Sequence, residues 1–357
     1  MDQSNEVSGA GEMRQNMLTN RWVIVAPDRG RRPYDFGRPA TETVNLPERE
    51  AGCPFCPGNE RMLPAVLFEL PAGDGRSWQT RVVPNKFPVL TPNGGSVSPV
   101  RGPHRAAPNY GHHNVIIETP VHNRDLPVMS RAEVERVIDT YVRRYAELRD
   151  ADERIESIVI FRNHGEKAGT SLRHPHSQVI ATGALPEFTA RRERIARDHF
   201  ERYHRCPLCY LTEFERSDGT RMVVENESFS AFVPFAAEAP YEVWIVPRRH
   251  RPDFGQISGQ EQEDLAPILQ DVLRRYDKQL NDPDYNYIFH SHFRPDTDAP
   301  HLHWYVQVRP RLTTPAGFEI GSEMQINVSV PENDAEVLRS AHSVGEAVDK
   351  SSGARNA

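Results

Sequence analysis

The sequence predicts an α+β fold built from two fused copies of one strand–helix–strand unit. All 4 cysteines fall into two Cys-x-x-Cys pairs, Cys53/Cys56 and Cys206/Cys209. In each half the pair is followed by a candidate ligand histidine, His122 or His250, and then by a His-x-His motif, with one expected helix and one expected strand between them. This repeated order of chemical groups and structural elements indicates a duplication.

The spacing of the histidines supports the duplication. His174 follows His122 by 52 residues, and His301 follows His250 by 51. On this spacing, His301 is expected to be the second-half counterpart of His174.

Apolar periodicity and turn residues place the elements along the chain. In the first half we expect strands at 21–26, 79–84, 114–118, 157–161 and 179–181, and a helix from about 130 to 150. In the second half we expect strands at 222–224, 230–233, 242–246, 285–289 and 300–308, and a helix from about 258 to 279. Ser130 followed by Glu133 predicts a capping box at the start of the first helix.

These elements divide the chain into an N-terminal half at 13–188 and a C-terminal half at 206–340, joined by a charged linker at 189–205. The ends, 1–12 and 341–357, are rich in small and polar residues and are expected to be disordered.

Composition excludes several classes of protein. The chain has 357 residues, 38% of them apolar, and a net charge of -7 with acids and bases interleaved. No basic block resembles a nucleic-acid-binding surface, so a nucleic-acid partner is not expected. The acidic N-terminus is unlike a signal peptide, and no apolar run reaches the roughly 18–20 residues that span a bilayer. We therefore expect a cytoplasmic protein with no membrane partner.

The cysteine pairs favour metal binding, since paired thiols in a reducing compartment more often bind metal than form structural disulfides. Two thiolates and two imidazoles form a tetrahedral donor set that suits Zn²⁺ and leaves no position open for water. We expect two structural zinc sites, formed by Cys53, Cys56, His122 and His174 in the first half and by Cys206, Cys209, His250 and His301 in the second. His290 or His292 is an alternative second-half ligand, and free cysteines with unconnected histidines are the plainer alternative.

The stretch 163–178 is the expected reactive site. It lies between two short apolar strands, and Gly165 and Gly169 let its backbone approach a ligand closely. If His174 binds metal, His176 lies beside it on the same face of a strand and has little freedom. A neutral imidazole held in this way can act as a nucleophile toward phosphorus. A polar loop with ordinary histidines is the alternative.

Other polar groups fit a phosphate substrate. Gln178 and Ser171 are expected to donate to the non-bridging oxygens, whose charge must be stabilised during displacement. Arg29 and Arg32, in a basic turn, are candidates for the permanent positive charge that a diphosphate needs. A solvated turn is the alternative for these arginines.

Taken together, the motifs resemble the galactose-1-phosphate uridylyltransferase family of the histidine-triad superfamily. The resemblance covers roughly residues 14–339. Its motifs are Trp22-Val23…Arg29…Arg32-Pro33, Cys53-Pro-Phe-Cys56-Pro-Gly58, Pro84-Asn-Lys-Phe-Pro88, Thr119-Pro-Val-His122, Asn163-x-Gly165…Gly169-x-Ser171…His174-Pro-His176-x-Gln178, and Gly317-Phe-Glu-Ile-Gly-Ser-Glu-Met324.

The resemblance implies a ping-pong reaction. His176 would attack the α-phosphorus of UDP-glucose and release glucose 1-phosphate, and galactose 1-phosphate would then take the uridylyl group. The substrate-binding residues that it implies are Asn85 and Phe87 near the nucleotide, Asn163, Ser171 and Gln178 at the phosphates, and Glu323 at the sugar hydroxyls. It also implies a homodimer with active sites at the subunit interface, and antiparallel sheets that form two half-barrels flanked by helices.

Three features qualify the resemblance. Ser177 stands where the better-studied transferases carry Pro or Gly and resembles adenylyl-transferring relatives such as ADP-glucose phosphorylase, so an adenylyl donor is the alternative. The second Cys-x-x-Cys stands in place of the Glu and three His that well-studied bacterial enzymes use. His303, expected as the counterpart of His176, is followed by Tyr305 where Gln is expected, so only the first half is expected to be catalytic. A third hypothesis is a non-enzymatic zinc protein whose two cysteine knuckles support a binding surface.

Overall fold

The computed structural model describes residues 11–31, 46–73, 75, 77–95, 101–292 and 299–341. Arg32 and nearly all of the two ends predicted to be disordered lie outside these ranges. The strands are β1 (Glu12–Gln15), β2 (Trp22–Val25), β3 (Phe68–Pro71), β4 (Trp78–Pro84), β5 (Gly111–Ile117), β6 (Ser157–His164), β7 (His176–Thr182), β8 (Met222–Glu225), β9 (Phe229–Phe232), β10 (Val243–Pro247), β11 (Tyr285–His290), β12 (Tyr305–Pro310) and β13 (Gln325–Asn327). The α-helices are α1 (Arg131–Ala151), α2 (Glu187–Tyr203), α3 (Pro207–Asp218), α4 (Gly259–Leu280), α5 (Gly317–Ser322) and α6 (Pro331–Ser340). Short 3-10 helices are η1 (Pro27–Arg31), η2 (Glu60–Met62), η3 (Leu126–Val128), η4 (Glu166–Ala168) and η5 (Phe254–Gln256).

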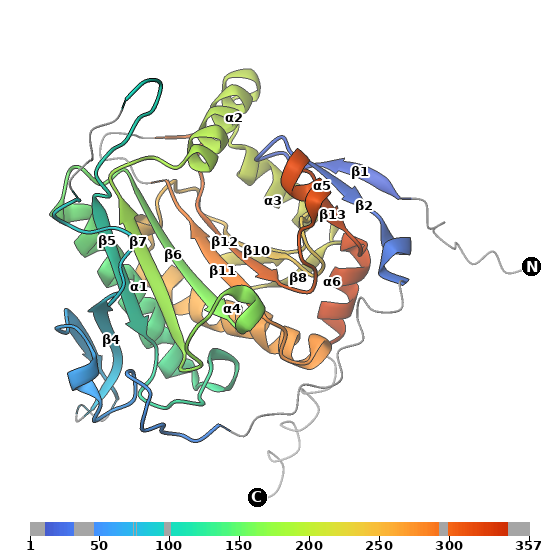
Figure 1. The fold of residues 1–357 in the computed structure, drawn as a ribbon. Helices are drawn as coiled ribbons and strands as arrows, with labels where there is room; N and C mark the ends of the chain where they lie inside the picture. The colour runs from blue at the N-terminus through green and yellow to red at the C-terminus, as the bar shows by residue number, and fades with distance from the viewer. Residues whose placement is uncertain are drawn as a thin grey trace, which may run out of the picture.

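One antiparallel sheet of ten strands joins the two halves (Figure 1). Its strand order is β3-β4-β5-β7-β6-β11-β12-β10-β9-β8, which reads as five strands of the first half followed by their counterparts in reverse. The pairing of β6 with β11 makes the central junction. The predicted α+β class is therefore confirmed, and the sheets of the two halves form one continuous layer.

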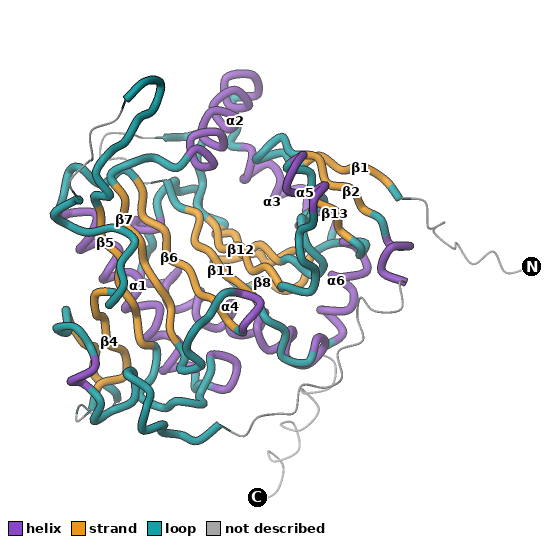
Figure 2. Tube along the Cα trace, viewed as in Figure 1, coloured by secondary structure: helices purple, strands orange, loops and turns teal. Residues whose placement is uncertain are grey.

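The helices α1 and α4 lie together against one face of this sheet (Figure 2). Their apolar sides form the main core with the strands, including Ile138 on α1 and Leu269 on α4. Both helices begin with a capping box, Ser130 with Glu133 and Ser258 with Glu261. The box satisfies backbone N–H groups that have no partner within the helix, which explains why each helix begins where it does.

Side chains along β7 alternate between the face covered by the helices and the opposite face. Ser177, Val179 and Ala181 are buried toward the helices. Successive side chains on a strand point to opposite faces, so His176 and Gln178 point to the face away from the helices.

A smaller sheet of β1, β2 and β13 stands apart from the large one. Among the described residues, no helix combines the length and the apolarity needed to cross a bilayer.

Replacing Ser130 with alanine is expected to lower the free energy of unfolding by about 1 kcal/mol, because the N3 amide of α1 loses its acceptor. Ser130→Asp keeps an acceptor at the same place and is expected to retain most of the stability. Denaturant unfolding followed by circular dichroism measures both variants. Equal stability of Ser130→Ala and the parent protein would contradict the role of the cap.

Candidate active site and metal clusters

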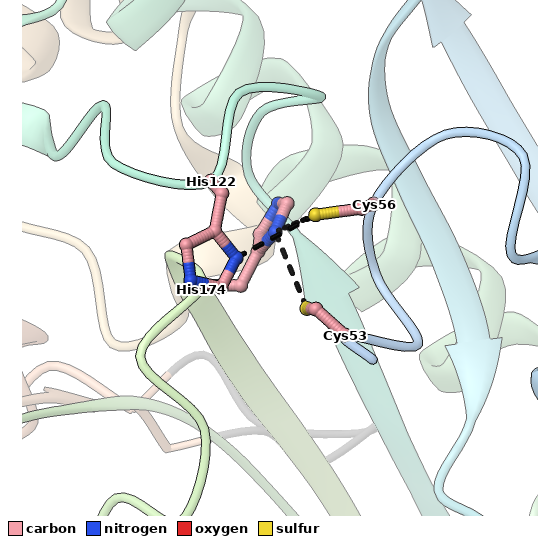
Figure 3. A group of neighbouring side chains, drawn as sticks. All are labelled: Cys53, Cys56, His122 and His174. Carbon is pink, nitrogen blue, oxygen red and sulfur yellow. Dashed lines mark hydrogen bonds between the residues drawn. The ribbon is translucent and has the colours of Figure 1, made fainter. Parts of the chain in front are cut away.

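Two cysteines and two histidines from separate loops meet near the start of β7 (Figure 3). His174 Nδ1 lies 3.7 Å from Cys53 Sγ and 3.6 Å from Cys56 Sγ. His122 Nδ1 lies 3.5 Å from Cys56 Sγ. A tetrahedral ion with bonds of about 2.3 Å to sulfur and about 2.0 Å to nitrogen separates these donors by roughly 3.5 Å, so the spacing fits one shared ion.

The outer nitrogens of both imidazoles face acceptors. His174 Nε2 lies 2.7 Å from the carbonyl oxygen of Thr119, and His122 Nε2 lies 3.0 Å from Glu50 Oε2. The carbonyl oxygen of Thr119 places the proton of His174 on Nε2 and leaves Nδ1 as a ligand. Burial lowers the pKa of His174 to about 4, which keeps the ring neutral.

The second half contains a similar cluster of Cys206, Cys209, His250 and His303. Cys209 Sγ lies 3.3 Å from the Nδ1 atoms of both histidines. Their ring centroids are 5.2 Å apart, against 5.3 Å for the histidine pair of the first cluster. The structure therefore corrects one predicted ligand, because His303 and not His301 belongs to this cluster.

Strand register explains this correction. Phe161 of β6 and Ile288 of β11 pair with each other at the central junction of the two halves. Phe161 also pairs with Gln178, and Ile288 pairs with Gln307, so Gln307 is the structural counterpart of Gln178. Counting back along the strands makes Tyr305 the counterpart of His176. The same count makes His303 the counterpart of His174. This corrects the expectation that His303 is the counterpart of His176. The segment His303-Trp-Tyr-Val-Gln307 carried this signal in the sequence, because it matches His174-Pro-His-Ser-Gln178 in its first and last residues.

The alternative second-half ligands also lie outside the cluster. His290 Nε2 contacts Gln307 Oε1 at 2.8 Å, and His292 Nδ1 lies 3.4 Å from Glu193 Oε1. Unlike His174, both His250 and His303 have buried Nε2 atoms that find no hydrogen-bond partner within the described residues, and His122 Nε2 has only its ion-pair contact with Glu50. The second cluster thus lacks an outer hydrogen bond like the one that joins His174 to the carbonyl oxygen of Thr119.

His176 lies beside the first cluster with one ring nitrogen engaged. Its Nδ1 lies 2.8 Å from the carbonyl oxygen of His174, which can only accept, so Nδ1 carries the proton. Among the described residues, no hydrogen bond engages Nε2, so its lone pair is available. Phe55 packs on the ring at a centroid distance of 5.3 Å, and burial lowers the pKa of His176. The ring is thus neutral, oriented and open at one nitrogen.

A polar network lies on the opposite face of β7. The hydroxyls of Ser177 and Tyr141 both donate to Glu118 Oε1. Arg162 Nε lies 3.1 Å from Glu118 Oε2, and all four side chains are buried. Ser177 therefore bonds into the core and does not face the surface where His176 Nε2 is open.

The second half holds the loop between β6 and β7. Asn286 Nδ2 donates to Asn163 Oδ1 at 2.8 Å and to the carbonyl oxygen of Ala168 at 2.9 Å. Asp284 accepts from the backbone N–H of Lys167 at 2.6 Å. Gly165 has a φ of 83°, and a Cβ there would collide with the Asp284 carboxylate. The loop geometry thus depends on glycine and on residues from β11 and the turn before it.

The other predicted substrate residues are spread more widely. Asn85 and the 80% exposed Phe87 follow β4, and Ser171 is exposed on the loop before β7. Arg29 is exposed in η1. Glu323 ends α5, which lies beside the small sheet and away from β7 (Figure 1), and it pairs with Arg21 at 3.1 Å and Arg191 at 3.3 Å.

Sequence reasoning missed His113 on β5. Its Nε2 lies 2.7 Å from Gln178 Oε1 and 3.2 Å from Asn85 Nδ2, so one imidazole touches two of the predicted substrate residues. No local motif marks this histidine, because its partners come from neighbouring strands.

Comparison with known proteins gives matches along nearly the whole chain. The family model described as galactose-1-phosphate uridyl transferase, N-terminal domain, matches residues 3–186, and the model of the C-terminal domain matches residues 184–350. The chain is 35% identical to ADP-glucose phosphorylase of Arabidopsis thaliana over 332 residues, covering 92% of each protein. It is 32% identical to galactose-1-phosphate uridylyltransferase of Thermotoga maritima, covering 92% of this chain and 98% of that one.

The crystal structure of the Arabidopsis thaliana ADP-glucose phosphorylase with bound ADP-glucose has a similar fold. It aligns with a TM-score of 0.79 at 32% identity, covering 92% of this chain and 98% of the other.

The corrected ligand set predicts how metal content responds to mutation. His303→Ala is expected to lose about one metal equivalent per chain, because a four-donor site reduced to three binds weakly. His301→Ala, two residues away, is expected to keep the full content. Inductively coupled plasma mass spectrometry of the purified variants measures this. Loss of metal in His301→Ala alone would restore the original assignment.

Gly165→Ala is expected to distort the loop and lower the free energy of unfolding by about 1–3 kcal/mol, because alanine is strained at this φ and its Cβ meets Asp284. Gly73→Ala is the matched control, since a Cβ at residue 73 has open space around it. Denaturant unfolding of the two variants provides the comparison. A similar effect in both would show that the Asp284 contact does not constrain the loop.

Proposed function

The chain belongs to the galactose-1-phosphate uridyl transferase family, and from this premise we propose that it transfers a nucleotidyl group through a covalent intermediate on His176. The observation that carries the proposal is the state of that imidazole, which is neutral, bonded at Nδ1 and open at Nε2. The donor substrate would be a nucleoside diphosphate hexose.

In the first step, Nε2 of His176 would attack the α-phosphorus. The N–P bond forms as the bond from the α-phosphorus to the bridging oxygen breaks, and the hexose 1-phosphate leaves with that oxygen. The ring becomes cationic, and the carbonyl oxygen of His174 stabilises the proton on Nδ1. In the second step, a phosphate oxygen of the acceptor attacks the same phosphorus and releases the imidazole.

Three side chains around the loop are proposed to hold the phosphates. Gln178, on the same face of β7 as His176, and Ser171 would donate to the non-bridging oxygens, where preorganised donors stabilise developing charge. Asn163, held by Asn286, would contribute its amide as a third donor. Arg29 and Arg32 are proposed as the source of positive charge, and Asn85 and Phe87 as contacts to the nucleoside.

Both Cys-and-His clusters fit Zn²⁺ by their donor sets, and we propose that each binds one zinc ion. A site with four protein ligands has no position for substrate, so the ion would serve as a cross-link between loops. In the first half, an ion bound by His174 would also fix the backbone carbonyl oxygen of His174, which orients the His176 ring.

Two nucleotide sugars are candidates for the nucleotidyl donor, UDP-glucose and ADP-glucose. The resemblance predicted UDP-glucose with galactose 1-phosphate as acceptor, whereas the Arabidopsis thaliana relative, an ADP-glucose phosphorylase, supports an adenylyl donor with phosphate as acceptor. The higher identity to the phosphorylase favours ADP-glucose. Ser177 adds no support to either donor, since its hydroxyl bonds into the core.

The site is proposed to be completed by a second copy of the chain. Glu323 is paired with Arg21 and Arg191 beside the small sheet. If this carboxylate holds the hexose, as the family resemblance implies, it would reach the hexose from the partner in a homodimer.

Incubation with ADP-glucose is expected to add one adenylyl group to the protein, and mass spectrometry of the intact chain and its peptides is expected to locate it on His176. His176→Ala should acquire no label, because Nε2 is the attacking atom. His112→Ala serves as the control, since it removes a histidine from β5 and leaves the loop intact.

Other outcomes are equally informative. A uridylyl adduct formed from UDP-glucose alone would establish the galactose 1-phosphate route. Absence of any adduct with either donor, in protein that contains both metal ions, would reject covalent transfer and favour a non-enzymatic zinc protein.

A further inference from the structure

The carboxamide of Gln178 is oriented by a residue that the proposed mechanism does not yet use. Gln178 Oε1 lies 2.7 Å from Nε2 of His113, which is buried on β5. The register of β5 and β7 pairs Val115 with Gln178, so His113 is the diagonal neighbour of Gln178 on the same face of the sheet.

The protonation of His113 follows from its second contact. The backbone N–H of Val89 donates to His113 Nδ1 at 3.3 Å, so Nδ1 is unprotonated. A neutral imidazole then carries its hydrogen on Nε2, and burial lowers the pKa of His113 in agreement with a neutral ring. That single hydrogen points to the nearer acceptor, Gln178 Oε1. The amide nitrogen of Gln178 is left facing away from His113 with both hydrogens free among the described residues.

Asn85 does not compete for this hydrogen. Its Oδ1 accepts from the backbone N–H of Phe87 at 2.8 Å, so its amide cannot turn over to present oxygen to His113. His113 thus donates to Gln178 and, through Val89, also holds the segment that carries Asn85 and Phe87.

The second half of the chain provides an internal comparison. Trp244 pairs with Gln307 as Val115 pairs with Gln178, so Glu242 occupies the position of His113. Glu242 Oε1 accepts from Gln307 Nε2 at 2.7 Å and from Trp244 Nε1 at 2.7 Å. At the matching position, Gln307 therefore turns its amide nitrogen toward Glu242, whereas Gln178 turns its amide oxygen toward His113.

We infer that His113 is a positioning residue, which turns the Gln178 amide so that its N–H groups face the phosphate of the nucleotide sugar. The inference rests on the proposed function and adds His113 to it as the residue that makes the Gln178 amide a hydrogen-bond donor to the substrate. The second half, with Glu242 at this position and Tyr305 in place of His176, lacks both the donor and the nucleophile.

An isosteric pair of substitutions separates this role from a structural one. His113→Gln keeps an N–H that can donate to Gln178 Oε1, whereas His113→Glu places only acceptors there, as in the second half. The rate of His176 nucleotidylation, measured by rapid quench and mass spectrometry, is expected to fall about 100-fold in His113→Glu, as for the loss of one preorganised donor. His113→Gln is expected to stay within about threefold of the parent protein, on the same principle that the donor is kept.

Metal content and circular dichroism of both variants establish that each is folded. Equal losses in the Gln and Glu variants would overturn the inference, because they would show that His113 only supports the fold. An unchanged rate in His113→Glu would overturn it as well.

A second measurement does not depend on activity. Nitrogen-15 spectra of protein labelled at histidine, assigned by the signals missing in His113→Gln, are expected to show hydrogen on Nε2 and none on Nδ1 of His113. Hydrogen on Nδ1 would reject the inferred orientation of Gln178 even if wild-type His176 is labelled normally. If wild-type His176 takes no label, the proposed reaction fails while the spectra still decide how His113 is protonated.

Discussion

The hydrogen bond from His176 Nδ1 to the carbonyl oxygen of His174 is the contact on which the site depends. This hydrogen bond orients the His176 ring only if the backbone at His174 is held in place. The His174 side chain lies among Cys53, Cys56 and His122, and this contact holds the backbone. The cluster is thus linked to the His176 ring through the carbonyl group of His174. Because His174 and His176 are two residues apart and their side chains share one face, the cluster that holds His174 also orients the His176 ring.

Duplication gave the chain two versions of this arrangement, and they have diverged by substitution at matching positions. Tyr305 stands at the position of His176, the proposed nucleophile, and Glu242 stands at the position of His113. The second half nevertheless supports the reactive loop, because Asn286 and Asp284 bond to it across the β6–β11 junction. The second half therefore serves as a scaffold for the loop of the first half.

The accuracy of the sequence predictions follows from how local each signal is. The first cluster and the start of α1 were predictable, because cysteine spacing and a capping box are written in short stretches of chain. His301 was chosen wrongly because intervals between motifs change with loop length, whereas the pairing of strands does not. His113 gave no signal at all, since its role arises from a register between β5 and β7 that a single sequence does not encode.

The geometry also limits where a choice between adenine and uracil can arise. Ser177, the residue that distinguishes the motif in sequence, bonds to Glu118 on the face of β7 opposite His176 and Gln178. The loop with Asn163 would meet phosphates, which are common to both donors. An exposed ring such as Phe87 stacks on any base and gives affinity with little selectivity. Under the proposed reaction, discrimination must therefore come from polar groups beside that ring. The Asn85 amide is one such polar group: its Oδ1 accepts from the backbone N–H of Phe87 at 2.8 Å, and its Nδ2 lies 3.2 Å from His113 Nε2.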